Sequence, residues 1–379
     1  MLYLKIKKYK THNMEKNSVK QIHDFGQSIW LDFIDRKIMD SGELKRLLEE
    51  DGVRGITSNP AIFEKAISSS DDYKDDIAKL TEKEMTNEAI FYGVAVEDIK
   101  RAADMLKPLY DDSEGGDGFV SLEVSPHLAR NTEGTANQAF ELWKAVRKEN
   151  VMIKIPGTAE GLTAIRRAIR EGININVTLL FGLGRYEDVT DAYISGLEDR
   201  LKNNQPIEHV ASVASFFLSR IDVLVDPMLE AKGLKQLKGE VAIASAKKAY
   251  EIYQRVFTSE RFMKLKDKGA QPQRLLWAST GSKDPAFSDV KYVEALIGPD
   301  TVNTIPMETL LAFKDHGKAA SRLESGLAHA TRVLEDLKKA GIDLDAITRQ
   351  LEEEGIEKFN QPYDKLLEAI EGQKKKIKA

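Results

Sequence analysis

A single lysine interrupts a short apolar run, and its position is the first sign of chemistry in this chain. The run covers residues 151–155, and Lys154 is its only charged member. Burying an ammonium is costly and burial lowers the pKa of a lysine, so an amine placed there can act as a neutral nucleophile. Such an amine can form an imine with a carbonyl compound. The alternative is a strand-edge lysine whose head reaches water.

Six other apolar runs carry polar residues near their ends, and these supply carboxylates, amides and hydroxyls. In chain order the residues are Asp32, Thr57, Asn59, Glu123, Asn176, Thr178, Ser215 and Ser279. If the runs are strands of one barrel, their carboxyl ends meet at one mouth, and these groups share a pocket with Lys154. The set suits imine chemistry, in which an amine attacks, a carboxylate moves protons and hydroxyls position a water. Any one of them alone is better explained as a capping or strand-edge group.

Two segments after these runs have the composition of an anion site. Arg220 closely follows Phe216 and Phe217, and a guanidinium there could hold a phosphate. The small-residue loop from Ser279 to Lys283 could add backbone N–H groups and an ammonium.

The elements that must position these residues are eight apolar runs of strand length with helical patterns between them. The runs are 28–33, 53–57, 119–124, 151–155, 173–178, 210–214, 274–278 and 301–305. They are mostly apolar throughout, as expected for strands covered on both faces. Alternation of strand and helix favours parallel pairing, and eight units fit an α/β fold of the (β/α)8 TIM-barrel type. A doubly wound open sheet is the competing architecture.

Helices are predicted between the strands and after the last one. Apolar spacing indicates helices over 160–171 and 239–262. Beyond the eighth run we predict helices over 317–337, 343–353 and 357–371. We therefore divide the chain into a poorly ordered N-terminal extension (1–20), a barrel (21–316) and a C-terminal helical appendix packed on the barrel (317–379).

Composition excludes several classes of protein. Of the 379 residues none is cysteine and six are histidine, which argues against disulfides, thiolate catalysis and zinc sites, and no metal is expected. The net charge of −5 gives no general attraction to nucleic acid. No stretch approaches the ~20 apolar residues that span a membrane, so we expect a cytoplasmic protein.

Weaker signals have structural explanations. Gly182 and Gly184 follow a strand, but Glu187 stands where a dinucleotide site would need its third glycine. The acidic residues at 71, 72, 75 and 76 are expected on a solvated helix face. Trp277 is expected to pack in the core.

Seven pieces of sequence together resemble the transaldolase family, specifically its longer bacterial branch within the class I Schiff-base aldolases. The similarity runs from about Gln27 to His316. The matching pieces begin at Ile29, Gly55, Val120, Ile153, Gly172, Ser215 and Trp277, and they contain the polar residues named above except Lys283.

The resemblance implies a transferase of carbohydrate metabolism, in the non-oxidative pentose phosphate pathway, that works without a cofactor. It moves a dihydroxyacetone unit from sedoheptulose 7-phosphate or fructose 6-phosphate to glyceraldehyde 3-phosphate or erythrose 4-phosphate. Lys154 would form the imine, Asp32 would exchange the proton of the C4 hydroxyl, and Glu123 with Thr178 would hold the water. The retained unit would be bound by Asn59 and Asn176, with Thr57 and Ser215 nearby and Phe217 as a wall.

This chain departs from the family pattern at the expected phosphate site. Gly281 stands where shorter transaldolases carry an arginine, so we assign phosphate binding to Arg220, Ser279 and Lys283 together. Two other functions stay open on the sequence: a single-substrate aldolase that cleaves fructose 6-phosphate, and a non-catalytic barrel scaffold. We expect a monomer or homodimer.

Overall fold

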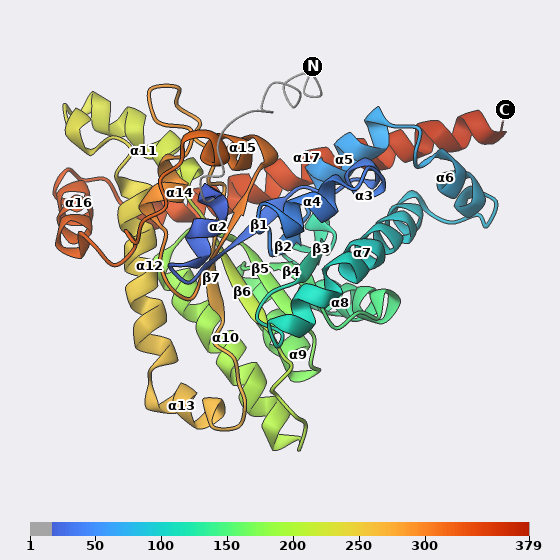
Figure 1. Ribbon diagram of the computed structural model, residues 1–379, viewed down its shortest axis with the longest axis horizontal. Helices are drawn as coiled ribbons and strands as arrows, with labels where there is room; N and C mark the ends of the chain where they lie inside the picture. Colours follow the sequence, from blue (N-terminus) through green and yellow to red (C-terminus); the bar gives the residue numbers. More distant parts are fainter. Residues whose placement is uncertain (1–16, 379) are drawn as a thin grey trace.

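Eight parallel strands close into a barrel in the computed structural model, which describes residues 17–378 (Figure 1). The strands are β1 (Gln27–Asp32), β2 (Gly55–Thr57), β3 (Phe119–Glu123), β4 (Val151–Pro156), β5 (Ile175–Leu180), β6 (Ser212–Phe217), β7 (Arg274–Ala278) and β8 (Thr301–Ile305). Each pairs with the next in sequence, and β8 pairs with β1. The predicted (β/α)8 barrel is confirmed, and the open doubly wound sheet is excluded.

Two strands lie further along the chain than the sequence indicated. We predicted the fifth over 173–178 and the sixth over 210–214, whereas β5 begins at Ile175 and β6 at Ser212. Asn174 explains part of this shift, because its side chain donates to Glu149 O at 2.7 Å and accepts from Ala211 N at 2.9 Å. Those bonds hold the segment before β5 as a connection. The shift places the end of β6 at Phe217.

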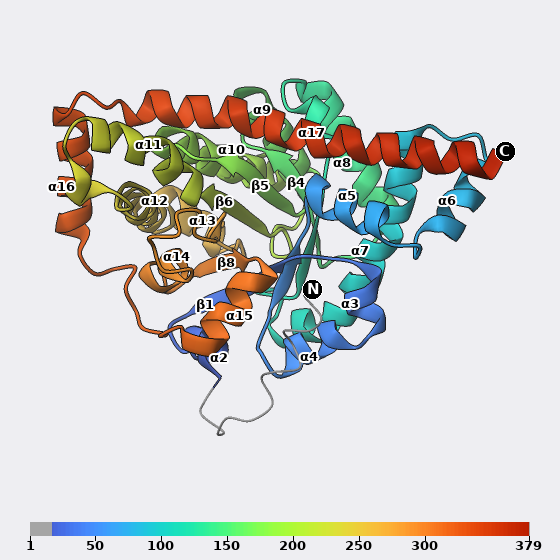
Figure 2. The ribbon, with the colours of Figure 1, turned by 90° about the horizontal axis from the view of Figure 1, so that it is seen from above.

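Helices surround the barrel, and the long connections from β2 to β3 and from β6 to β7 are helical (Figures 1 and 2). The helices between the strands are α3 (Arg36–Asp40), α4 (Glu43–Glu49), α5 (Pro60–Ser69), α6 (Lys74–Thr81), α7 (Asn87–Asp112), η1 (Pro126–Leu128), α8 (Thr132–Val146), α9 (Ala159–Arg170), α10 (Leu183–Lys202), α11 (Ser219–Ala231), η2 (Lys235–Leu237), α12 (Val241–Phe257), α13 (Glu260–Lys266) and α14 (Lys291–Ala295). The helix predicted over 160–171 is α9. The one predicted over 239–262 is two helices, because Ser259 caps α13 by accepting from Phe262 N.

Helix α15 (Met307–His316) follows β8, and two further helices complete the chain: α16 (Leu327–Lys339) and α17 (Leu344–Lys378). Our prediction of two short helices over 343–353 and 357–371 was wrong, because α17 is continuous through Pro362. A proline removes one helical hydrogen bond, but buried Phe359, Tyr363 and Leu366 pack the helix against the protein on both sides of it. Residues 317–326, also predicted helical, are irregular; Lys247 Nζ donates to Arg322 O at 2.7 Å there.

Helix α17 passes over segments that follow the carboxyl ends of strands. It packs against α5, α7 and α11, against η1 and against β5 itself. It extends from beside α16 on one side of the molecule to beside α6 on the other (Figure 2).

The amino-terminal end of the barrel is closed by a charged network around buried Asp117. This carboxylate accepts from Ser28 Oγ at 2.8 Å and from Arg274 Nη2 at 3.0 Å. Arg54 Nη1 lies 3.4 Å from it, and Trp30 Nε1 donates to it at 3.3 Å. The network joins residues at the start of β1, β2, β3 and β7, so it stabilises the barrel at the end away from the polar strand ends.

Other expectations concern the surface and the chain ends. Trp277 is fully buried, as predicted. The prediction of a solvated acidic helix face was right only in part: Asp71, Asp72 and Asp75 are exposed, but the first two precede α6, and Asp76 is half-buried and pairs with Arg36 at 2.8 Å. The predicted N-terminal extension lies mostly outside the described residues, and its boundary at 20 falls within α2 (Ser18–His23). Among residues 17–378, no helix is both long enough and apolar enough to cross a membrane.

Gly55 gives a test of packing inside the barrel. A Cβ on Gly55 would lie 2.5 Å from the Trp30 ring, so Gly55→Ala should lower the free energy of unfolding by about 1–3 kcal/mol. Urea unfolding measures this. Gly184→Ala in α10 is the control, because outside the adjoining turns of its own helix no described atom lies within 4 Å of the added methyl, and the variant should be neutral or slightly more stable. Equal stability of the two variants would contradict this account.

Candidate active site

Strand register brings a carboxylate, an amine and an amide into one row. Glu123 on β3 pairs with Lys154 on β4, and Lys154 pairs with Asn176 on β5. Parallel neighbours in register point their side chains to the same face, so all three side chains project into the barrel. The row lies near the carboxyl ends of the strands, where barrel enzymes place their active sites.

Lys154 is 5% exposed and lies inside the barrel near its carboxyl-terminal end. Its Nζ donates to Ser58 O, after β2, at 3.1 Å and lies 3.6 Å from Glu123 Oε2. One carbonyl and one carboxylate leave part of the three-donor capacity of the ammonium unused. The amine therefore faces the pocket with room for another partner.

Glu123 is buried, and burial changes its acidity. Neither carboxylate oxygen has a hydrogen-bond partner among the described residues. Burial raises the pKa of Glu123 to about 7, although the nearby Lys154 charge opposes the shift. A small enclosed space beside it is lined partly by Phe63, Phe91 and Tyr363. A carboxyl group with this pKa can both give and take a proton near neutral pH.

Asp32 lies at the end of β1 and is held by two threonines. Thr57 Oγ1 donates to Asp32 Oδ1 at 2.7 Å, and Thr304 Oγ1 lies 2.6 Å from Thr57 Oγ1. Because a hydroxyl carries one proton, Thr57 must accept from Thr304 when it donates to Asp32. Burial raises the pKa of Asp32, and Lys154 and the Thr57 bond oppose that shift. The second oxygen stays available to a ligand.

A chain of side-chain hydrogen bonds fixes Asn176. Ser215 Oγ donates to Asn176 Oδ1 at 2.6 Å, and Asn176 Nδ2 donates to Ser121 Oγ at 3.0 Å. Thr178, two residues further along β5, is fully buried, and its hydroxyl has no partner within residues 17–378. Asn59 has a structural task as well, because its side chain caps α5 by accepting from Ile62 N at 3.1 Å.

The residues predicted to bind an anion follow β6 and β7 and differ in exposure. Arg220, at the start of α11, lies with Cζ 5.6 Å from the centre of the Phe217 ring. Ser279 has a positive φ of 55°, and its hydroxyl lies 2.9 Å from that of Ser219. Lys283 is exposed in the loop after β7, and its Nζ lies 3.8 Å from the position of a Cβ built on Gly281. Lys283 thus folds back over the segment that follows Ser279.

Sequence reasoning missed several residues of the pocket. Ser121 lies two residues before Glu123 in the same strand, so period-two alternation could have found it. Thr304 is a polar residue near the end of the eighth predicted strand, so the sequence could have indicated it as well. Nothing in the sequence indicated Phe359 and Tyr363 of α17, because only the fold brings that helix to the strand ends.

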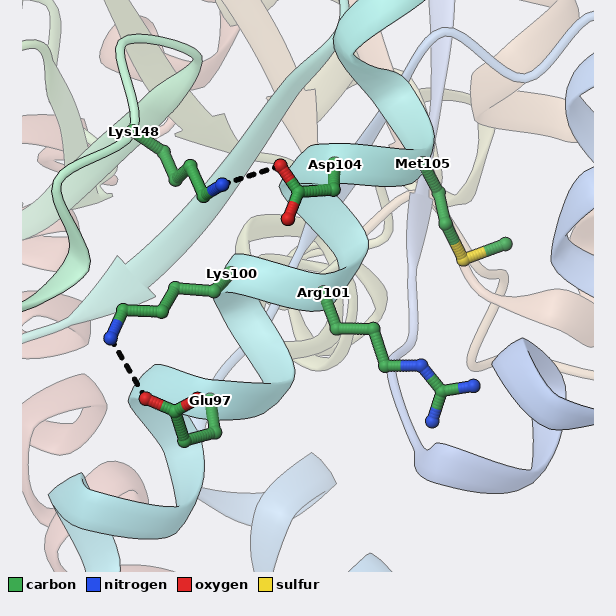
Figure 3. A pocket seen from close by; sticks show the side chains of 6 residues that line it. All are labelled: Glu97, Lys100, Arg101, Asp104, Met105 and Lys148. Carbon is green, nitrogen blue, oxygen red and sulfur yellow. Dashed lines mark hydrogen bonds and ion pairs between the residues drawn. The ribbon is translucent and has the colours of Figure 1, made fainter.

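A larger hollow of about 520 Å³ lies elsewhere, along α7 and near the end of α8 (Figure 3). Its cations are already paired: Lys100 with Glu97 at 2.8 Å, Lys148 with Asp104 at 2.5 Å, and Arg101 with Asp40. It touches no strand end, and we interpret it as a solvated surface groove.

Comparison with known proteins agrees with this geometry. Residues 29–370 match the family described as Transaldolase/Fructose-6-phosphate aldolase. The chain belongs to the transaldolase/fructose-6-phosphate aldolase family. It is 47% identical over 376 residues to Transaldolase 2 of Nostoc sp., covering 96% of this chain and 99% of the relative. It is 45% identical to Transaldolase of Trichodesmium erythraeum (96% and 99% covered) and 45% identical to that of Saccharopolyspora erythraea (94% and 98%). The predicted family is confirmed, and with it an enzyme of the transferase class.

The environment of Glu123 predicts a pH dependence of stability. The folded pKa of about 7 exceeds the ordinary 4.5, so between these values the folded state binds more protons than the unfolded state. Glu123 then favours folding below the lower pKa and loses this contribution as pH rises through the upper one. Relative to Glu123→Gln, wild type should lose up to about 1.4 kcal/mol per pH unit in this window.

Urea unfolding at pH 5 and pH 8 measures the difference between the two proteins. Glu141→Gln, which removes an exposed carboxylate, is the matched control and should run parallel to wild type. A constant difference between wild type and Glu123→Gln across this range would contradict the assignment.

Proposed function

We propose that this protein transfers a dihydroxyacetone unit between sugar phosphates through an imine on Lys154. The donor is fructose 6-phosphate or sedoheptulose 7-phosphate, and the acceptor is erythrose 4-phosphate or glyceraldehyde 3-phosphate. The observation that carries the proposal is a buried amine with Glu123 Oε2 at 3.6 Å and Asp32 near enough for its pKa to respond to the amine.

The first half-reaction forms an electron sink on the enzyme. Lys154 Nζ attacks C2 of the donor, and the resulting carbinolamine loses water to give a protonated imine. Asp32 accepts the proton of the C4 hydroxyl, and the C3–C4 bond breaks, with its electron pair passing into the imine to give an enamine. The shortened aldose leaves. Because the protonated imine takes up these electrons, the proposal requires neither metal nor organic cofactor.

The second half-reaction reverses these steps with another aldehyde. The enamine attacks the acceptor carbonyl, Asp32 returns its proton to the new hydroxyl, and water hydrolyses the imine. Glu123 and Thr178 supply the acid–base groups for that water, which is consistent with a carboxyl pKa of about 7 and with polar atoms that lack protein partners.

The remaining polar residues bind and orient the substrate in this proposal. Asn59, Asn176, Thr57 and Ser215 bind the hydroxyls of the retained unit, and Phe217 forms a wall. Arg220, Ser279 and Lys283 hold the phosphate. The names of the relatives support transfer over simple cleavage of fructose 6-phosphate, and a scaffold would have no use for a buried amine. We place the reaction in the cytoplasm, in the non-oxidative pentose phosphate pathway, on a monomer or homodimer.

Trapping the imine tests the proposal. Incubation with fructose 6-phosphate followed by borohydride reduction should leave a three-carbon adduct on Lys154, located by peptide mass mapping. Lys247 is the internal control, because it is also buried but donates to backbone carbonyls outside the mouth and should stay unmodified. Active enzyme with unmodified Lys154 would exclude the mechanism. Addition of erythrose 4-phosphate before reduction should discharge the adduct if the enzyme transfers rather than cleaves.

Replacing Asp32 should separate imine formation from carbon–carbon cleavage. Asp32→Asn keeps an acceptor for Thr57 but cannot take the C4 proton, so turnover should fall by roughly 10²–10⁴-fold. Borohydride should then trap a six-carbon adduct on Lys154 in place of the three-carbon one. A three-carbon adduct formed at the wild-type rate would remove Asp32 from this role.

A further inference from the structure

Arg220 is a cation without a partner of opposite charge. Within residues 17–378 no carboxylate forms an ion pair with it, and its Nη1 is buried without a hydrogen-bond partner. Burial lowers the pKa of Arg220, although guanidinium stays charged at neutral pH. Arg220 is half-buried, so its charge is partly removed from water with no carboxylate to offset it, and an anionic ligand would supply that partner.

Two aromatic rings hold this guanidinium, and they come from distant parts of the chain. Its Cζ lies 5.6 Å from the centre of the Phe217 ring at the end of β6. The same Cζ atom lies 6.0 Å from the centre of the Phe359 ring, which comes from α17. Contact with a ring face stabilises a cation without using any N–H group. The rings therefore fix the guanidinium and leave its donors free.

Helix α17 is seated so that Phe359 keeps this position. Gly355, one turn earlier, allows close approach to β5, because a Cβ there would lie 2.9 Å from Leu179 Cδ2. Glu352 Oε2 lies 3.3 Å from Arg185 Nε. Phe359 itself is 6% exposed. The absence of a side chain at Gly355 therefore lets α17 lie directly against Leu179.

The nearest negative charge is already engaged with its own helix. Burial lowers the pKa of Arg220, and the negative charge of Glu354 opposes that shift, so Glu354 is close enough to act on the guanidinium. Its carboxylate, however, accepts from Gln350 Nε2 at 2.8 Å and from Lys358 Nζ at 3.1 Å. It is thus occupied by neighbours on α17 and does not take the place of an anionic ligand.

We infer that Phe359 of the C-terminal helix is a positioning residue for Arg220 and thereby sets the preference for phosphorylated substrates. This inference rests on the proposed function, in which Arg220 binds the substrate phosphate. It adds that α17 is part of the substrate site. Loss of the Phe359 ring should leave the guanidinium free to turn away, so binding of the phosphate weakens while the chemistry on Lys154 is unchanged.

The experiment compares two donors, fructose 6-phosphate and fructose, with glyceraldehyde as an acceptor that lacks phosphate. Phe359→Leu keeps an apolar side chain but removes the ring. It should raise KM for fructose 6-phosphate by about tenfold, the equivalent of ~1.4 kcal/mol, with kcat within twofold of wild type. The kinetic constants for fructose should not change. Inhibition by inorganic phosphate should weaken by a similar factor.

Three variants control for a purely structural effect. Phe359→Tyr retains the ring and should keep the wild-type KM. Leu366→Ala removes a fully buried side chain from the same helix and should lower stability without changing KM. In an Arg220→Met background, Phe359→Leu should have no further effect on KM, because the two residues act on the same phosphate.

The outcomes separate this inference from the proposed function. Wild type without transfer activity or an adduct on Lys154 would refute the function itself. Active wild type with equal losses for both donors in Phe359→Leu would leave the function standing and refute the role of Phe359. If Phe359→Leu does not fold, Phe359→Met replaces it, and the interaction with Arg220→Met decides the question.

Discussion

An amine and a carboxylate buried together inside a closed barrel are the interaction on which the rest of this structure depends. Lys154 Nζ and Glu123 Oε2 lie 3.6 Å apart on neighbouring strands, and both residues are buried. Glu123 receives no hydrogen bond from the described residues, so its charged form is poorly stabilised and its pKa rises to about 7. A flexible site would relax by admitting water or by separating the pair. The rigid strands on both sides hold the pair in place. The pKa of Glu123 therefore stays raised, and its carboxyl group can give and take protons near neutral pH.

Closure of the barrel is what places the second carboxylate. Asp32 on β1 depends on Thr57 of β2, which in turn accepts from Thr304 of β8. This hydroxyl chain crosses the seam where the last strand meets the first, so it exists only if β8 pairs with β1. In an open sheet those strands would lie at opposite edges. Asp32 would then lose the contact that orients its free oxygen toward the pocket.

Most of the barrel and its polar centre could be predicted from the sequence, because strands buried on both faces leave continuous apolar runs that end in polar residues. Lys154 and Glu123 stood out in this way. The position of β6 could not be predicted, since the residue before it, Ala211, donates its N–H to the side chain of Asn174, which is distant in sequence. The continuity of α17 was also hidden: Pro362 indicates a break, and only packing against the barrel offsets it.

The rigid C-terminal helix α17 lies against both the Arg220 region and the Glu123 region. Phe359 and Tyr363 are one helical turn apart, so they project from the same face of α17. Phe359 lies beside the Arg220 guanidinium, whereas Tyr363 lines the space beside Glu123 and donates to Glu88 at 2.6 Å. Because one helix carries both rings, its docking places the Phe359 ring beside the Arg220 guanidinium and the Tyr363 ring at the space beside Glu123. A displacement of α17 would alter both at once, which makes the helix a structural determinant of the site although it supplies none of the reacting atoms.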